Sequence, residues 1–326
     1  MKKIITFTIL SLFVFHLSFG QDHKKYSELI KEAWNLYEAK EYFQSGQKYN
    51  EAFAEYGGSG VLDDLYNAGC SWALANQPDS AFRWLSLASG AGNYTNLKHI
   101  TTDLDLNSLH NDERWSKIIE TVKFNKEKVE ANFDKDLVAI LDTIYDEDQK
   151  YRARSIEIEK THSWDSDEVR SLWKTIHEKD SINLIKVRKI LDERGWLGAD
   201  IVGEKGNSAL FLVIQHSDQE TQEKYLPMMR EAVKKGNAKA SSLALLEDRV
   251  ALGKGEKQIY GSQLMCFPDE GCSLQPLADP DNVDKRRAEV GLGPIKDYVA
   301  NWGIVWDVEE YKKQLSEYEE KIFRTK

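Results

Sequence analysis

Apolar residues recur every three or four positions along most of the chain, which is the spacing of one face of an α-helix. In the second half, this pattern predicts successive helices that begin near Leu137, with a long one ending at Gly195 and a loop over residues 195–206 after it. Glycines and prolines interrupt it over residues 255–280, where the short runs predict a β-hairpin or irregular loops. Two short helices and a charged terminal helix from Asp307 follow. The pattern predicts a mainly α fold with one small irregular or hairpin element.

An aliphatic run closes one of these predicted helices at Gln215 and His216, within "LFLVIQHSDQET". The next helix is expected to start at a capping box formed by Ser217 and Glu220. Pro227 should kink that helix or start a new turn.

Two stretches near the N-terminus can be laid over one another, with Ser45 and Ala81 in equivalent places 36 residues apart. Each predicts a pair of helices joined by a short turn, and small and aromatic residues recur at helical spacing. Over about residues 26–90 the pattern resembles the tetratricopeptide repeat. The resemblance implies a concave surface that holds a peptide or protein partner. A further helix, around "RWSKIIETV", is expected to cap the stack.

The first twenty residues differ from the acidic remainder of the chain. Lys2 and Lys3 precede an apolar stretch, and the small residues Ser18 and Gly20 close it. This is typical of a secretory signal removed after Gly20, and the alternative is an uncleaved membrane anchor. The expected organisation is a leader over 1–20, a tetratricopeptide-like domain over 21–130 and a second helical domain over 131–326, in an exported, periplasmic or extracellular protein.

Export would place the cysteines in an oxidising compartment, where thiols can pair as disulfides. Cys266 and Cys272 bracket the turn-rich "FPDEG" and are expected to form a disulfide, with two free thiols as the alternative. Cys70 lies among apolar residues at helical spacing and is expected to be buried and inert.

Composition narrows the possible partners. A net charge of −10 over 326 residues argues against binding the phosphate backbone of nucleic acid. No phosphate loop, dinucleotide fingerprint, nucleophile elbow or metalloprotease helix occurs in the sequence, and no zinc-ligand array is present. No metal or cofactor is therefore expected.

Several polar stretches of the second half occur together in one order, namely "DEDQKYR", "DSIN", "VGEKGNSALFLVIQHSD", "LEDRVALGKGEKQIYGSQ" and "VDKRRAEVGLGPIKDY". Over about residues 140–300 they resemble the domain of unknown function 6624 family, which has no established activity. The chain departs from it by inserting "MCFPDEGCSL". The matching positions are Asp146, Gln149, Arg152, Asp180, Asn183, Gln215, His216, Asp248, Arg249, Gln258, Tyr260, Gln263, Arg286 and Arg287.

Asp248 and Arg249 border an apolar helical stripe, so each needs a partner if it leaves water. A structural ion pair between helices is one interpretation. The other is an anion or polar-ligand site with Arg249, Arg286 or Arg287 as the binding fork. A solvated helix face would explain at least one of the adjacent pair Arg286 and Arg287.

The "YGSQ" stretch allows two similar interpretations. It predicts a tight turn at Gly261, or Tyr260 and Gln263 presented to a ligand.

Three roles remain open for His216: a helix-terminal residue favoured by the helix dipole, a general base or ligand contact, or a metal ligand with weak support from Asp218, His177 and Asp180. The leading hypothesis for the chain is a partner-binding repeat scaffold joined to a ligand- or partner-binding helical domain. The rival is a hydrolase-like enzyme, with His216 as base, Asp248 orienting it and an arginine stabilising anionic charge. A purely structural second domain is the third possibility.

Overall fold

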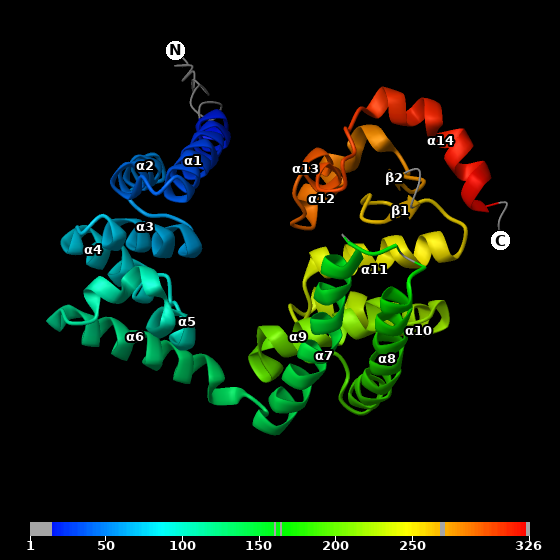
Figure 1. Ribbon diagram of the computed structural model, residues 1–326, viewed down its shortest axis with the longest axis horizontal. Helices are drawn as coiled ribbons and strands as arrows, with labels where there is room; N and C mark the ends of the chain where they lie inside the picture. The colour runs from blue at the N-terminus through cyan, green and yellow to red at the C-terminus, as the bar shows by residue number, and fades with distance from the viewer. Residues whose placement is uncertain (1–14, 160, 164, 268–270, 324–326) are drawn as a thin grey trace, which may run out of the picture. The chain divides into compact units, whose positions relative to one another are not determined.

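The computed structural model describes residues 15–159, 161–163, 165–267 and 271–323 (Figure 1). Helices dominate, and one two-stranded sheet lies near the C-terminus, so the expected mainly α fold is confirmed. The chain divides into two compact units, Met1–Ala131 and Asn132–Lys326, and each has its own hydrophobic core.

The predicted leader lies mostly outside the described residues, and only its end is seen, as the start of α1 (Phe15–Glu38). Among the described residues, no helix is both long and apolar enough to cross a bilayer.

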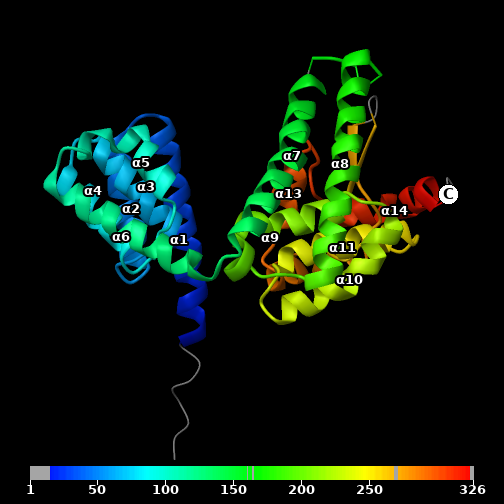
Figure 2. The ribbon, with the colours of Figure 1, turned by 90° about the horizontal axis from the view of Figure 1, so that it is seen from below.

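The first unit consists of two helical hairpins followed by two short helices and a longer one of 17 residues (Figures 1 and 2). The hairpins pair α1 with α2 and α3 with α4. The elements after α1 are α2 (Tyr42–Glu55), α3 (Leu62–Leu74), α4 (Pro78–Ser89), α5 (Leu97–Thr102), η1 (Leu104–Leu109) and α6 (Glu113–Val129).

Small residues let these helices pack closely. Ser45 and Ala81 are both fully buried, in α2 and α4. The Ser45 hydroxyl donates to the Ala33 carbonyl at 2.8 Å, which satisfies it inside the core. A Cβ added at Gly46 would lie 2.5 Å from the Trp72 ring, so no larger residue fits against this indole without displacing it.

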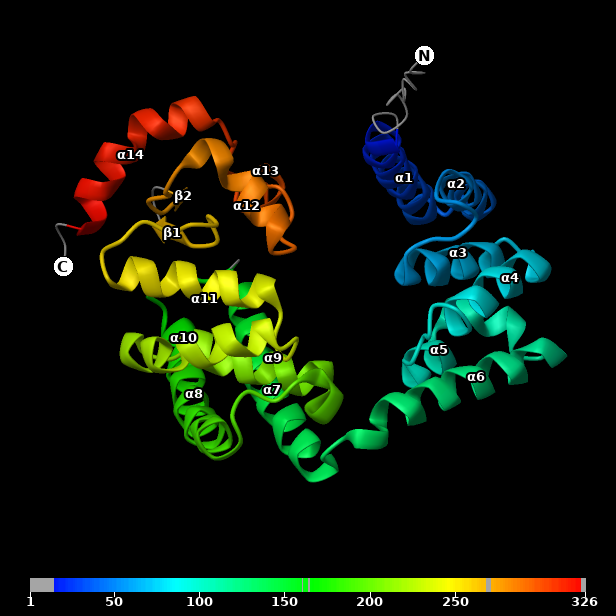
Figure 3. The ribbon, with the colours of Figure 1, turned by 180° about the vertical axis from the view of Figure 1, so that it is seen from behind.

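The second unit is built on a long helix pair, with a third helix packed against both members and two further helices packed on that third one (Figure 3). Arg194 pairs with Asp134 near one end of the pair, while Arg152 pairs with Asp180 farther along it, so the two helices run antiparallel. The elements are η2 (Glu130–Asn132) at the join of the units, α7 (Lys135–Glu159), α8 (Asp167–Arg194), α9 (Ala199–Gln215), α10 (Gln219–Lys234) and α11 (Ala240–Gly253).

Most helix boundaries follow the sequence pattern, with two corrections. Residues 195–206 were expected to form a loop, but α9 begins at Ala199 and passes through Gly203, whose φ is 70°. Gly195 ends α8 with φ of 71°, a conformation that glycine adopts without a Cβ penalty. The cap of α10 is Asp218 and not Ser217: the Asp218 carboxylate accepts from Thr221 N at 2.8 Å. The Ser217 hydroxyl instead donates to the end of α9, and α10 continues through Pro227.

Of the two alternatives for residues 255–280, a β-hairpin or irregular loops, the structure shows a hairpin. Strands β1 (Leu264–Phe267) and β2 (Gly271–Leu274) pair antiparallel, with Cys266 opposite Cys272 and their sulfurs 1.99 Å apart. Cys70 is free and buried. A small separate core joins the hairpin to the helices that follow it. These are η3 (Pro280–Asn282), α12 (Val283–Glu289), α13 (Ile295–Ala300) and α14 (Val308–Phe323).

Candidate functional site

His216 caps the C-terminus of α9 and contacts a carboxylate from another helix. Its Nδ1 lies 2.9 Å from Asp148 Oδ1, on α7. An ionised carboxylate only accepts hydrogen bonds, so this contact places the proton of a neutral ring on Nδ1. Nε2 then carries the lone pair, and no described residue bonds to it. The imidazole is 19% exposed, so this nitrogen can accept a proton or contact a ligand.

Asp148 itself is almost completely enclosed, with its side chain 1% exposed. Burial would raise the pKa of its carboxyl, but the hydrogen bond and charge of His216 together with the charge of Arg152 outweigh this, and the pKa is lowered. Gln149 donates a further hydrogen bond, to Oδ2 at 2.7 Å. Asp148 is therefore ionised at neutral pH and holds the imidazole in one orientation.

Arg152 joins this pair to α8. Its Nη1 lies 3.1 Å from Asp148 Oδ1, and its two Nη atoms reach the Asp180 carboxylate at 3.0 and 2.7 Å. All three side chains are mostly buried, so solvent screens the network weakly. The carboxylates of Asp148 and Asp180 and the guanidinium of Arg152 together form a rigid support that fixes the position of the His216 ring.

Arg249, on α11, approaches the same region without a carboxylate partner. Its Nη1 donates to the Gln215 carbonyl at 2.6 Å, and its Nε donates to Gln263 Oε1 at 3.2 Å. Burial and the nearby charge of Arg152 lower its pKa. No described residue forms an ion pair with this guanidinium, and its Nη2 has no hydrogen-bond partner among them. One edge of the fork is therefore available to an anion.

Two buried amide side chains nearby have polar atoms without a hydrogen-bond partner among the described residues. Asn183 lies one helical turn from Asp180 on α8, is fully buried, and has neither of its amide atoms hydrogen-bonded within the described protein. Gln215 Oε1 is likewise buried without a partner. Such groups usually bond to water or to a ligand, because an unpaired buried amide is costly.

Asp248 does not perform the role expected for it. The carboxylate that contacts His216 belongs to Asp148. Asp248 is fully buried and accepts backbone N–H groups from the loop after α11, at 2.6 Å from Ile259, 2.9 Å from Tyr260 and 3.0 Å from Ser262. Burial raises its pKa, and these backbone hydrogen bonds oppose the rise. The prediction that Asp248 orients His216 was wrong, because its oxygens anchor this loop.

The paired arginines of α12 also serve the loops. Arg286 Nε donates to the Ile259 carbonyl at 2.9 Å, and its Nη2 reaches the Ala278 carbonyl at 2.6 Å. Arg287 is buried and donates to the carbonyls of Gly293 and Tyr260 at 2.6 and 2.8 Å. Arg286 Nη1 also donates to the Asp279 carboxylate at 3.1 Å. The Nε and Nη1 donors of Arg287 are taken by backbone oxygens, and its guanidinium lies over the Tyr298 ring, so neither arginine presents the ligand fork considered from the sequence.

The chain bends at Ile259 and Tyr260, at the start of the "YGSQ" stretch, and Gly261 follows with φ of 66°. The main chain of Tyr260 is held by Asp248 and Arg287, whereas Gln263 faces Arg249. Of the ligand-facing residues proposed from the sequence, Arg249 and Gln263 therefore lie in contact beside Gln215 and His216.

The sequence reasoning missed Asp148. It named Asp248 as the carboxylate beside His216, and the family resemblance covered Asp146, which is exposed and pairs with Lys205. The available signal was helical phase: Leu141, Ile144 and Asp148 lie on one buried face, so a carboxylate there had to find a partner inside the fold.

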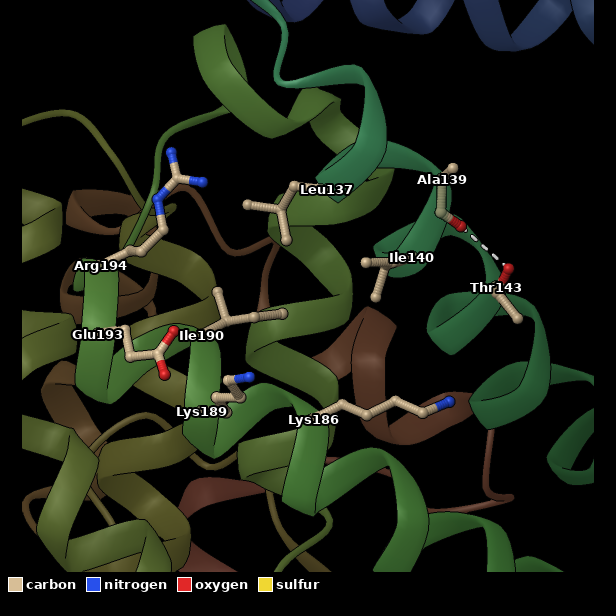
Figure 4. Close-up of a pocket in the computed structure, with 9 residues that line it drawn as sticks. All are labelled: Leu137, Ala139, Ile140, Thr143, Lys186, Lys189, Ile190, Glu193 and Arg194. Atoms are coloured by element: carbon tan, nitrogen blue, oxygen red, sulfur yellow. Dashed lines mark hydrogen bonds between the residues drawn. The ribbon is translucent and has the colours of Figure 1, made fainter.

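A groove of about 650 Å³ lies between α7 and α8, farther along the helix pair (Figure 4). Leu137, Ile140 and Ile190 form its apolar side, while Lys186 and Lys189 flank it. None of the candidate residues lines it, so the polar cluster and this groove are separate features of the unit.

Comparison with known proteins places these residues in one family. No curated protein and no solved structure matches the chain. The model of the family of unknown function DUF6624 matches residues 135–307, more than half of the 326 residues. That range contains α7–α13 and every residue of the cluster around His216 and Arg249. The chain belongs to the DUF6624 family.

Proposed function

We propose that the DUF6624 unit binds a small anionic ligand between Arg249 and His216. The observation that carries this proposal is a largely buried guanidinium with neutral oxygens as its only described partners and a second arginine as its charged neighbour. An uncompensated buried cation is costly, and an anion that accepts from its free edge would offset that cost. The His216 ring, held by Asp148, supplies a second donor when it is protonated.

The test is binding of inorganic phosphate and sulfate to the purified protein, measured by calorimetry. We expect Arg249→Gln to weaken binding by about tenfold or more, as for loss of a charge-assisted hydrogen bond. Arg249→Lys retains the charge without the fork and should give an intermediate loss. Arg170→Gln, at an exposed ion pair on α8, is the matched control and should bind as the parent does. If neither phosphate nor sulfate binds, or if Arg249→Gln binds them normally, the proposal fails.

A hydrolase-like enzyme is the second candidate, and the contact between His216 and Asp148 is the observation that favours it. His216 would take a proton through Nε2, Asp148 would hold the ring, and Arg249 would stabilise developing negative charge. We expect hydrolysis of p-nitrophenyl esters or phosphates to fall on His216→Asn substitution with the fold unchanged. Activity that survives this substitution would remove His216 as the base.

The first unit extends the proposal to the whole chain. We infer an exported protein whose helical hairpins contact a protein partner and whose DUF6624 unit binds the ligand. The small-residue packing of the hairpins and the basic–apolar–small order of the first twenty residues support this inference. The compartment can be tested by fractionating the producing cells and detecting the protein in each fraction with an antibody. Recovery only from the cytoplasm would contradict export.

A further inference from the structure

The first unit carries a groove that the DUF6624 site does not involve. Two adjoining hollows of about 480 and 460 Å³ share Tyr66, Asn67 and His99. Their walls come from α1, α3, α5 and the start of η1. Together they form one groove, here called the aromatic–acidic groove.

Exposed apolar side chains line one of the two hollows of this groove. Trp34 is 42% exposed and stacks on Tyr37, with ring centroids 5.2 Å apart. Leu104 is 77% exposed. Large apolar side chains that line a hollow and remain in water are typical of a surface that a partner covers.

The charge of the groove has one sign. Asp63, Asp103 and Asp105 line it, and no lysine or arginine does. Among the described residues, none of the three carboxylates pairs with a lysine or arginine, and the basic side chain near Asp103 is His99, whose Nε2 lies 3.7 Å from Asp103 Oδ2. Burial and the charges of Asp103 and Asp105 raise the pKa of the Cys70 thiol, so the groove disfavours further negative charge.

Hydrogen bonds hold two of these carboxylates against the aromatic rings. The Tyr37 hydroxyl donates to Asp105 at 2.5 Å, and the Tyr66 hydroxyl donates to Asp103 at 2.8 Å. An ionised carboxylate can accept about four hydrogen bonds. Asp105 accepts from Tyr37, whereas Asp103 also accepts from Asp105 N and Cys70 Sγ, so most of the unused acceptor positions lie on Asp105. The acceptors and the indole face are therefore fixed before any partner arrives, which lowers the entropy cost of binding.

We propose that the aromatic–acidic groove binds a basic segment of a partner protein. A lysine or arginine side chain would lie across Trp34 and donate to Asp103 and Asp105, because a cation is attracted both to an aromatic face and to a carboxylate. This inference rests on the proposed partner-binding role of the first unit and specifies the chemistry of its partner.

A metal ion is the competing occupant. One ligand atom each from Cys70, Asp103 and Asp105 lie within 4.8 Å of one another. However, the Cys70 thiol is buried, its pKa is raised, and it donates to Asp103, so the thiolate that would bind a metal is disfavoured.

The experiment measures binding of short fluorescein-labelled peptides to the full chain by fluorescence polarisation. The probes are Gly-Ser peptides that carry lysine and arginine, glutamate and aspartate, or no charge. We expect the basic peptide to bind tightest and its affinity to fall as salt rises. Asp105→Asn should weaken it by about tenfold, and Trp34→Leu by about two- to fivefold.

Matched controls separate recognition from folding. Glu120→Gln removes an exposed acidic charge on α6, outside the groove, and should bind as the parent does. In Asp105→Asn the amide oxygen can still accept from Tyr37, and circular dichroism melts check that this variant folds.

Each contrary outcome has a definite meaning. Equal binding of all three peptides, or an unchanged affinity of folded Asp105→Asn, would overturn cation recognition and leave a general partner-binding role. If no peptide binds, both the inference and the partner role of this groove fail. If Zn²⁺ or Ca²⁺ binds, is lost in Asp105→Asn, and no basic peptide binds, the groove belongs to a metal ion instead.

Discussion

Asp248→Ala tests how the loop over residues 258–263 is held to the DUF6624 unit. The carboxylate is fully buried in α11 and accepts the backbone N–H groups of Ile259, Tyr260 and Ser262. Alanine removes all of these acceptors at once. It also removes a charge whose burial is unfavourable, as the raised pKa of the carboxyl indicates, and this change acts in the opposite direction.

The size of the loss follows from which N–H groups water can reach. Ile259 is 38% exposed, so water can replace the carboxylate at its N–H, whereas Ser262 is buried and Tyr260 is partly buried. An unsatisfied buried donor costs about 1–3 kcal/mol, so two of them cost about 2–6 kcal/mol. Since the loop relaxes and the buried charge disappears, we expect a loss of about 3 kcal/mol in the free energy of unfolding.

The assay combines urea unfolding with amide hydrogen exchange. Asp248→Asn keeps one acceptor oxygen and should lose about 1 kcal/mol. Asp146→Ala, at an exposed ion pair with Lys205, should change stability by less than about 0.5 kcal/mol. Exchange at the amides of Tyr260 and Ser262 should accelerate in the alanine variant. A loss below about 1 kcal/mol, with exchange unchanged at both amides, would refute the anchoring role.

Three further results are expected. His216→Ala should cost only about 1 kcal/mol in urea unfolding, because Asp148 retains Arg152 and Gln149; a loss above about 3 kcal/mol would show that the ring is mainly structural. The lowered pKa of Asp148 contributes stability that is present above its unfolded pKa and lost as pH falls through the folded one, so Asp148→Asn should flatten the acid limb of a stability–pH curve, and an unchanged limb would contradict this. Intact mass should show a chain beginning at Gln21, and reductant should add two hydrogens at Cys266 and Cys272; a retained leader or two alkylatable thiols would contradict it.

The site shows where sequence reasoning was sufficient and where it was not. Helical spacing predicted that Asp248 and Arg249 would leave water and need partners. It could not say which partners, because the loop that satisfies Asp248 lies 11–14 residues later and bonds through its backbone. Backbone donors are present in every sequence, so no residue type signals them.

Local patterns were enough to predict most of the helices of this protein, although not the start of α9 at Ala199. The apolar period predicted the helices, Gly195 predicted the end of α8, and the glycine-rich interruption predicted the region of the hairpin. These features depend on residues a few positions apart, whose interactions follow from local geometry.

Only the tertiary structure decided that His216 pairs with Asp148, which lies 68 residues away in the sequence. It also decided that Arg249 donates to a backbone carbonyl, with no carboxylate partner among the described residues. The antiparallel packing of α7 and α8 brought Asp180 to Arg152, and the packing of the C-terminal elements directed Arg286 and Arg287 onto loop carbonyls. Hydrogen bonds and ion pairs act over a few ångströms of space, so their partners are chosen by how the helices pack and not by distance along the chain.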